Sequence, residues 1–301
     1  MIREKFIQHI MDLQDQICHG LEEVDAKMRF REDLWERPGG GGGRTRVLAG
    51  GNVFEKAGVN TSVVEGEVTP VMRSQLQLSG DRFFATGISL VLHPLNPFVP
   101  TVHANYRYFE ISENGKLTDS WFGGGADLTP YYLFKEDAMH FHQVHKNACD
   151  DFGADLYPLF KRQCDEYFVN THRNNEARGI GGIFFDHVRA DKDRSMEEWF
   201  KFAVAAGNAF LPAYLPIVRW RMNSPYDESH RYWQEIRRGR YVEFNLVHDR
   251  GTLFGLRTNG RTESILMSLP PRVRFDYDYS PAPDSPEDEL WQVVKQPVNW
   301  V

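Results

Sequence analysis

The sequence contains little of what marks several large classes of protein. Cysteine is scarce: Cys18, Cys149 and Cys164 have no metal-binding spacing and cannot all pair in disulfides, which fits a reducing cytoplasm. No apolar run approaches the roughly 18 residues of a membrane-spanning helix. Residues 1–20 also lack the apolar region of a signal peptide. We therefore expect a cytoplasmic protein with no membrane span.

Positive charge is also in deficit. The 35 Lys and Arg residues against 42 Asp and Glu give a net charge of −7, which disfavours a general nucleic-acid binder. The glycine clusters form neither a dinucleotide fingerprint nor a phosphate-binding loop, and no serine-hydrolase elbow is present. In contrast, 21 Phe, 12 Tyr and 7 Trp are ample for a large core or an apolar pocket.

Several segments have the spacing of helices. In residues 1–30, apolar residues recur at steps of three and four, which places them on one face. Ser285 followed by Pro286 is typical of a helix start. The predicted helices cover residues 1–30, 136–149, 158–173 and 196–210 and a segment that begins at Ser285.

Other segments predict strands. Thr101–Ile111 alternates apolar and polar residues, and Ile88–His93 and Gly179–Val188 are β-rich. We also predict three strands at 241–248, 252–257 and 264–269, the last two joined by an Asn259-Gly260 hairpin. Such short connections join only antiparallel neighbours. We therefore expect an α+β fold, in which a large antiparallel sheet is flanked by helices on both sides.

Five consecutive glycines, Gly39 to Gly43, interrupt the sequence early. They fit a flexible linker or a mobile loop within one domain. Because residues 1–38 are too few to form a core, the loop is the better interpretation. The whole chain, 1–301, is then a single domain.

Polar residues that could carry chemistry lie on two of the predicted strands. Ser89 and His93 point the same way on one strand, and His103, Asn105 and Arg107 line one face of the next. If the proline-rich segment between the strands folds them together, these side chains converge. The patch is either a ligand site or a face exposed to water, and alternation alone does not decide between them.

Histidines and an aspartate suggest further sites. His140, His142, His145 and His172 lie on two predicted helices, and with the strand histidines they could bind a metal, although no HExxH motif is present. Hydrogen-bonded structural histidines are the alternative. Asp127 follows three glycines, which allow close approach of a ligand, and acts as a base or as a turn cap.

Arginines beside glycines suggest an acidic ligand. The guanidinium group binds carboxylates with two parallel hydrogen bonds, and surface salt bridges are the alternative role. The arginines in question are Arg44, Arg46, Arg107, Arg257 and Arg261.

Several long motifs resemble the oxygen-dependent coproporphyrinogen III oxidases. They include GISLVLHPLNPFVPTVHANYRYFE, WFGGGADLTPYY and RGRYVEFNLVHDRGTLFGL, and they occur in the family's order over residues 39 to about 279. The resemblance implies conversion of coproporphyrinogen III to protoporphyrinogen IX in haem synthesis. Two propionates become vinyl groups, with dioxygen as co-substrate and without flavin, haem or nicotinamide. It also implies a homodimer, and a divalent metal ion, manganese, in bacterial members.

The resemblance also assigns roles to residues. Ser89 and the strand Asn105, Tyr106 and Arg107 match substrate contacts, as does the loop Asn259, Gly260 and Arg261, in which Asn259 replaces the family's usual glycine. Asp127 matches a catalytic aspartate, and His103 a proton donor. Residues 240–275 match the dimer contact region. The residues that match metal ligands are His93, His103, His142 and His172.

The expected chemistry combines these residues. Asp127 would accept a proton or hydrogen bond from a pyrrole N–H, and His103 would handle protons. Arg107 and Arg261 would hold propionates, so that one of them is placed against the oxidant. Two other classes of function remain open: a histidine–metal hydrolase or oxygenase for another acid, and a tetrapyrrole carrier without activity.

Overall fold

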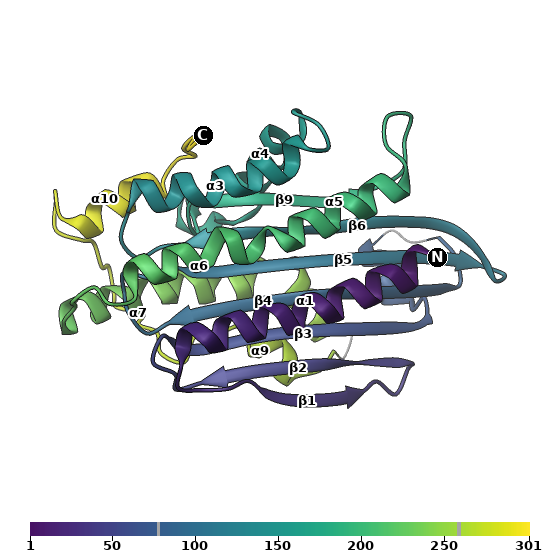
Figure 1. Ribbon diagram of the computed structural model, residues 1–301, viewed down its shortest axis with the longest axis horizontal. Helices are drawn as coiled ribbons and strands as arrows, with labels where there is room; N and C mark the ends of the chain where they lie inside the picture. Colours follow the sequence, from purple (N-terminus) through teal and green to yellow (C-terminus); the bar gives the residue numbers. More distant parts are fainter. Residues whose placement is uncertain (77–78, 258–259) are drawn as a thin grey trace.

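A broad antiparallel sheet organises the chain. The computed structural model describes residues 1–76, 79–257 and 260–301, and its larger sheet has seven strands in the order β1-β2-β3-β4-β5-β6-β9 (Figure 1). Consecutive strands from β1 to β6 pair antiparallel, as predicted, and all are joined by short connections except β3 and β4, between which α2 (Pro70–Leu76) lies. The strands are β1 (Arg31–Glu36), β2 (Gly41–Ala49), β3 (Phe54–Glu67), β4 (Arg82–Pro94), β5 (Thr101–Glu113), β6 (Lys116–Thr129) and β9 (Gly181–Val188).

Helices cover one face of this sheet, where most of the core lies (Figure 1). The predicted amphipathic helix is α1 (Ile2–Asp25), and Phe6, Ile10 and Ile17 on its apolar face are fully buried. A hydrophobic stripe of this width is stable only against another apolar surface, and α1 packs on β3 and β4. The other helices of this layer are α3 (Lys135–Asp150), α4 (Leu156–Tyr167), α5 (Met196–Asn208) and α6 (Phe210–Arg221).

The stretch Met196–Arg221, which comprises α5 and α6, is unusually apolar. Within the described residues it is the one helical stretch that is long and apolar enough to cross a membrane. The most apolar 18-residue segment of this stretch is 61% buried inside the protein, as in the core helix of a folded domain.

The second face of the sheet carries another group of helices, so the expected flanking on both sides is confirmed. They are α7 (Glu228–Glu243), the π-helical turn η2 (Phe244–His248), α8 (Arg250–Arg257) and α9 (Thr262–Leu266). Asn60 on β3 donates to the Ser264 carbonyl, and Lys56 donates to the Leu269 carbonyl, which ties this layer to the sheet.

The three strands predicted within 241–269 are therefore wrong. Asp227 caps α7 by accepting hydrogen bonds from the backbone N–H groups of the first turn. Buried Trp233, Arg237, Tyr241 and Phe244 then recur at steps of four, four and three, which is a helical period. The β-rich composition near residue 241 yields to this packing. Asn259, on which the hairpin prediction depended, lies outside the described residues.

Two smaller expectations also fail. Only the start of the glycine run is a loop: Gly39 and Gly40 lie in the turn between β1 and β2, whereas Gly41 to Gly43 belong to β2, where a Cβ on Gly43 would lie 2.3 Å from the Trp35 ring. The helix predicted over 158–173 ends at Tyr167, so His172 does not share its face.

The remaining elements are α2 (Pro70–Leu76), β7 (Val169–Asn170), η1 (Thr171–Arg173), β8 (Glu176–Ala177) and α10 (Pro286–Val293), whose N-cap is Ser285 as predicted.

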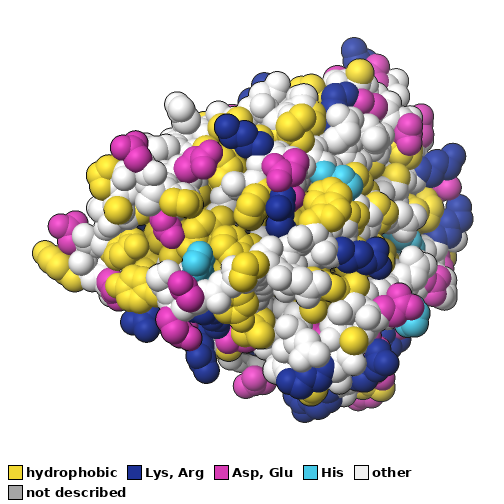
Figure 2. All heavy atoms as spheres, turned by 60° about the vertical axis from the view of Figure 1, so that its left-hand side comes forward, with side chains coloured by type: hydrophobic (Ala, Val, Ile, Leu, Met, Phe, Trp, Pro, Cys, Tyr) yellow, Lys and Arg dark blue, Asp and Glu magenta, His cyan; other side chains and the backbone are white. Residues whose placement is uncertain are grey.

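The surface mixes charged and apolar side chains. Figure 2 shows the face that includes the end of the molecule near α7 and α10, where apolar side chains gather between charges of both signs. Apolar atoms normally make up a large share of a folded protein's surface, so single exposed apolar side chains carry no functional meaning. Only groups of them on neighbouring elements indicate a contact surface.

Candidate functional site

The strand register brings the predicted polar residues together on the second face of the sheet. Ser89 on β4 is opposite Asn105 on β5, and His103 on β5 is opposite Asp127 on β6. Arg107 follows Asn105 by two residues on β5, so its side chain lies on the same face of the sheet. Since neighbouring strands lie about 4.8 Å apart, these five side chains form one patch. The convergence expected from the alternating pattern is thus confirmed for Ser89, His103, Asn105 and Arg107, whereas His93 is buried beneath the Ser268 carbonyl and does not reach the open patch.

The middle of this patch is open to solvent. Ser89 is exposed although β4 is the central strand of the sheet, and Asn105 and Arg107 are half-buried. On the opposite face of β5, by contrast, Val102 and Ala104 are completely buried. A central strand usually has both faces covered in a sheet flanked by two layers. The open polar patch is therefore where a ligand can approach.

Asp127 occupies the buried end of the patch. Its carboxylate is 1% exposed and accepts a hydrogen bond from His103 Nδ1 at 2.8 Å, and two from Arg178 Nη2 at 2.7 and 2.8 Å. Burial raises the pKa of Asp127, but the charge of Arg178 and the hydrogen bonds outweigh this, so the net pKa is lowered. An ionised carboxylate only accepts, so His103 carries its proton on Nδ1 and has Nε2 left for a substrate.

Arg178 is a site residue that sequence reasoning missed. Its guanidinium is 2% exposed and lies over three aromatic rings, those of Phe168, Tyr241 and Phe244, at 4.2 to 4.8 Å. The sequence signal was present in the ARGIGG segment immediately before β9, but nothing local assigns that arginine to Asp127. Because η2 and α7 supply two of the three rings, the pair also ties the sheet to its second helical layer.

Arg107 is held by a second missed residue, Asp186 on β9. Arg107 Nη2 lies 2.7 Å from Asp186 Oδ1, and Nη1 donates to Asn105 Oδ1 at 3.2 Å. Burial raises the pKa of Asp186, but His187 and Arg107 outweigh it and hold the pKa well below its usual range. Gly123 makes room for the pair, since a Cβ there would lie 2.9 Å from both partners.

Other predicted site residues lie elsewhere. Tyr106 points to the opposite face, where its hydroxyl donates to the Ala206 carbonyl. Arg261 lies toward the far edge of the sheet, 2.5 Å from Asp33 on β1, and Gly260 precedes it. Asn259 is outside the described residues. Arg44 and Arg46 face α1, where both pair with Asp15.

The four predicted metal ligands do not fit one metal ion. His93 is buried, with Nδ1 bonded to the Thr101 hydroxyl and Nε2 to the Ser268 carbonyl. His142 is buried between the Tyr157 hydroxyl and the Ile180 carbonyl. Both rings therefore have no nitrogen left for a metal.

The remaining two histidines lie apart from these. His172 bonds His248 and Glu243 at a half-exposed position, whereas His103 bonds Asp127. Within the part of the chain that the structure describes, no three His, Cys, Asp or Glu side chains form a group that could hold a metal ion. His93 and His142, with both ring nitrogens bonded inside the protein, fit the hydrogen-bonded structural role that was the alternative interpretation.

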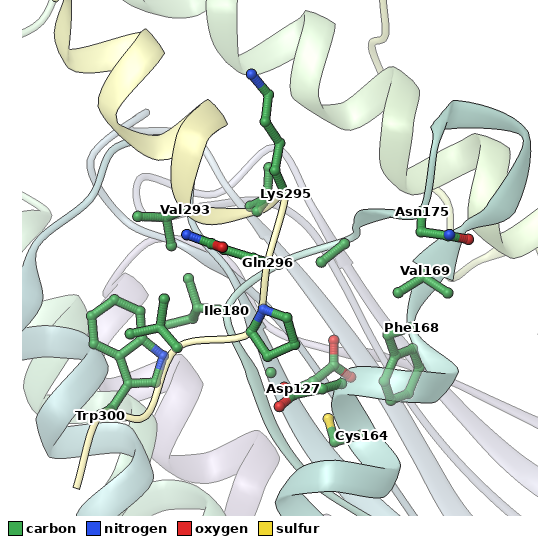
Figure 3. A pocket seen from close by; sticks show the side chains of 17 residues that line it. Asp127, Cys164, Phe168, Val169, Asn175, Ile180, Val293, Lys295, Gln296 and Trp300 are labelled. Atoms are coloured by element: carbon green, nitrogen blue, oxygen red, sulfur yellow. The ribbon is translucent and has the colours of Figure 1, made fainter.

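A pocket of about 50 Å³ opens beside Asp127, under the C-terminal segment (Figure 3). A site for a molecule of drug size or larger occupies roughly 300–1,000 Å³. This pocket is therefore too small for a tetrapyrrole, and the open patch around Ser89 is the surface on which a large ligand fits.

The patch thus combines a half-buried arginine, two neutral hydrogen-bonding side chains and a histidine oriented by a buried carboxylate, a set of groups suited to an acidic ligand. Comparison with known proteins names the class more closely, because the model of the coproporphyrinogen III oxidase family matches residues 5–300. The chain belongs to that family. Its reaction is the oxidative decarboxylation of coproporphyrinogen in haem biosynthesis, and coproporphyrinogen III, with four propionates, is an acidic substrate of the kind the site suits.

Buried neutral histidines predict acid sensitivity, most clearly at His145 on α3. Among the described residues, neither ring nitrogen of His145 has a hydrogen-bond partner, and burial lowers its pKa to about 4. The unfolded chain binds a proton near pH 6.5 and the folded chain does not, so this histidine costs stability as the pH falls from 6.5 to 4.

Replacing this side chain should make the protein less sensitive to acid. We expect His145→Leu to reduce the loss of unfolding free energy between pH 6.5 and 4.5 by about 2 kcal/mol, measured by urea denaturation. The exposed His19, replaced in the same way, is the control. Equal pH dependence of wild type and His145→Leu would contradict the assignment.

Proposed function

We propose that this chain uses dioxygen to convert two propionates of coproporphyrinogen III to vinyl groups. Each conversion follows R–CH2–CH2–COO⁻ + O2 + H⁺ → R–CH=CH2 + CO2 + H2O2. A hydrogen with its electron pair leaves the carbon next to the ring, and the C–C bond to the carboxylate breaks. Dioxygen takes up two electrons. The observation that carries the proposal is the patch of Ser89, Asn105, Arg107 and His103 in a chain of this family.

In this proposal Arg107 holds a propionate. Its side chain is 36% exposed and already pairs with one carboxylate, that of Asp186, so a substrate carboxylate meets a preformed binding group. Ser89 and Asn105, opposite each other on adjacent strands, supply neutral hydrogen bonds next to it. Fixing one propionate places the carbon that is oxidised, and such positioning supplies a large part of catalysis.

His103 supplies the proton and Asp127 acts through it. The lowered pKa of Asp127 makes it a weak base, which argues against direct removal of a pyrrole proton. Its ion pair with Arg178 instead fixes the His103 ring and directs Nε2 toward substrate. This differs from the expectation that Asp127 itself serves as the base.

The cysteines support dioxygen as the oxidant. Iron–sulfur clusters, which carry out much radical chemistry in the absence of oxygen, are held by several thiolates that converge on one cluster. The three cysteines of this chain lie on three different helices, α1, α3 and α4, where each is buried, and burial raises the pKa of every one of these thiols. A hydrolase or oxygenase built on a histidine–metal centre receives no support from the separated histidines.

The dioxygen proposal predicts that turnover stops without oxygen. We expect purified protein to form protoporphyrinogen IX from coproporphyrinogen III in air, with about one O2 consumed per CO2 released. The reaction should cease under argon and resume on re-aeration. Equal rates in air and argon would refute the proposed oxidant, and binding without turnover in air would favour the carrier.

The clamp proposal predicts a binding defect from Gly123→Ala. The added Cβ displaces the Arg107–Asp186 pair, whose atoms belong to flexible side chains, so the fold should persist. We expect KM for coproporphyrinogen III to rise on the order of tenfold, equivalent to about 1.4 kcal/mol, with a smaller change in kcat. Gly20→Ala on α1, where the new Cβ makes ordinary contacts at 3.4 Å, is the control. An unchanged KM would count against Arg107 as the clamp.

We also propose a homodimer formed through residues 240–275 and a cytoplasmic location. Leu246, Val247 and Leu256 in this segment are 40%, 56% and 41% exposed, which is unusual for apolar side chains on neighbouring elements. We expect Val247→Glu to give monomers in sedimentation velocity, whereas Leu117→Glu, at an equally exposed position on β6, should not. A wild-type monomer at micromolar concentration would refute the dimer.

The cytoplasmic location has the support of three cysteines that are all free.

A further inference from the structure

The pocket beside Asp127 is built by the C-terminal segment. Residues 293–300 pass over the gap between α4 and the connection from β8 to β9, and their side chains form one wall (Figure 3). The opposite wall comes from Cys164 and Phe168, with Ile180 at the side. The pocket is therefore a feature of the folded chain end rather than part of the open sheet face.

The pocket backs directly onto the site. Asp127 and Phe168 line it, and both also contact His103: the carboxylate at 2.8 Å, and the phenyl ring at 5.8 Å between ring centroids. It lies at the β6–β9 end of the patch, whereas Ser89 is on β4. One layer of side chains thus separates the pocket from the histidine, on the side away from the exposed strand.

Size and chemistry restrict what this pocket can hold. A water molecule needs roughly 10–15 Å³, so about 50 Å³ accommodates a few small molecules and excludes the macrocycle. Val293, Val294 and Ile180 make much of its lining apolar, and Asp165 and Lys295 supply polar groups. Burial raises the pKa of the Cys164 thiol well above its usual range, so this sulfur stays protonated and resists oxidation.

We propose that this pocket holds dioxygen and delivers it to the propionate beside His103. The inference rests on the proposed function, since each macrocycle consumes two O2 molecules in the reaction given above. A tetrapyrrole bound over Ser89 and Arg107 covers the open face, so the second O2 needs another approach. A proton path through the same pocket is disfavoured because both oxygens of Asp127 already accept hydrogen bonds.

The test fills the pocket from a lining residue that is not itself part of the site. Ala177 lines the pocket and is half-buried, and its main-chain N–H bond to the Val294 carbonyl does not depend on the side chain. We expect Ala177→Leu to lower kcat/KM for dioxygen on the order of tenfold, with KM for coproporphyrinogen III within about twofold of wild type. Ala205→Leu, at a half-buried alanine of α5, is the matched control and should leave both values unchanged.

Three results would overturn the proposal: an unchanged kcat/KM for dioxygen in Ala177→Leu, an equal loss toward both substrates, or the same defect in Ala205→Leu. If Ala177→Leu does not fold, Val298→Trp in the C-terminal segment fills the pocket from its other wall.

Crystals of the wild type under xenon pressure give a readout independent of turnover. Xenon beside Ile180 supports the gas site, and its absence there refutes it. Absence of oxygen uptake by the wild type would instead refute the proposed function.

Discussion

The buried ion pair between Asp127 and Arg178 is the interaction on which the site depends. Removing two charges from water costs several kcal/mol for each ion, and only close hydrogen bonds and packing offset that cost. Here the carboxylate accepts from both His103 and Arg178, and the guanidinium lies among aromatic rings from the end of α4, α7 and η2. Breaking the pair would leave an unpaired charge inside the protein. The strand that carries the site, the orientation of the histidine and the second helical layer are thus fixed by the same contact.

Much of the first helical layer and half of the site were predictable from the sequence. The step of three and four in α1 and the step of two in β5 are local patterns, and the face on which a side chain lies follows from them directly. Ser89, His103, Asn105 and Arg107 could therefore be placed together from sequence periodicity, once the proline-rich segment between the two strands was taken to fold them side by side. Asp186 and Arg178 could not, because their partners Arg107 and Asp127 lie 79 and 51 residues away in the sequence and meet them only where β9 joins the sheet next to β6. The predicted strand at 241–248 was wrong because Tyr241 and Phe244 continue a helical period of buried residues that begins at Trp233.

The histidines illustrate a second limit of sequence reasoning. Four histidines on strands and helices suggest a metal site only if their rings converge, and spacing along the chain does not determine that. His93 and His142 each join two elements by using both ring nitrogens, so their burial reflects structural hydrogen bonds. Burial lowers the pKa of both rings, which keeps them neutral and suited to that role. Polar residues that are buried and completely bonded thus contribute to specifying the fold.

The position of β1 at the margin of the sheet has a consequence for how copies of the chain meet. An unpaired strand is a template on which another chain can extend the sheet, and such association grows without limit into aggregates. Four of the six residues of β1 are charged, in the sequence REDLWE, and most of them are exposed. Charges of both signs in a row oppose the addition of a further strand. Any contact between copies of the chain is therefore disfavoured at the backbone of this margin.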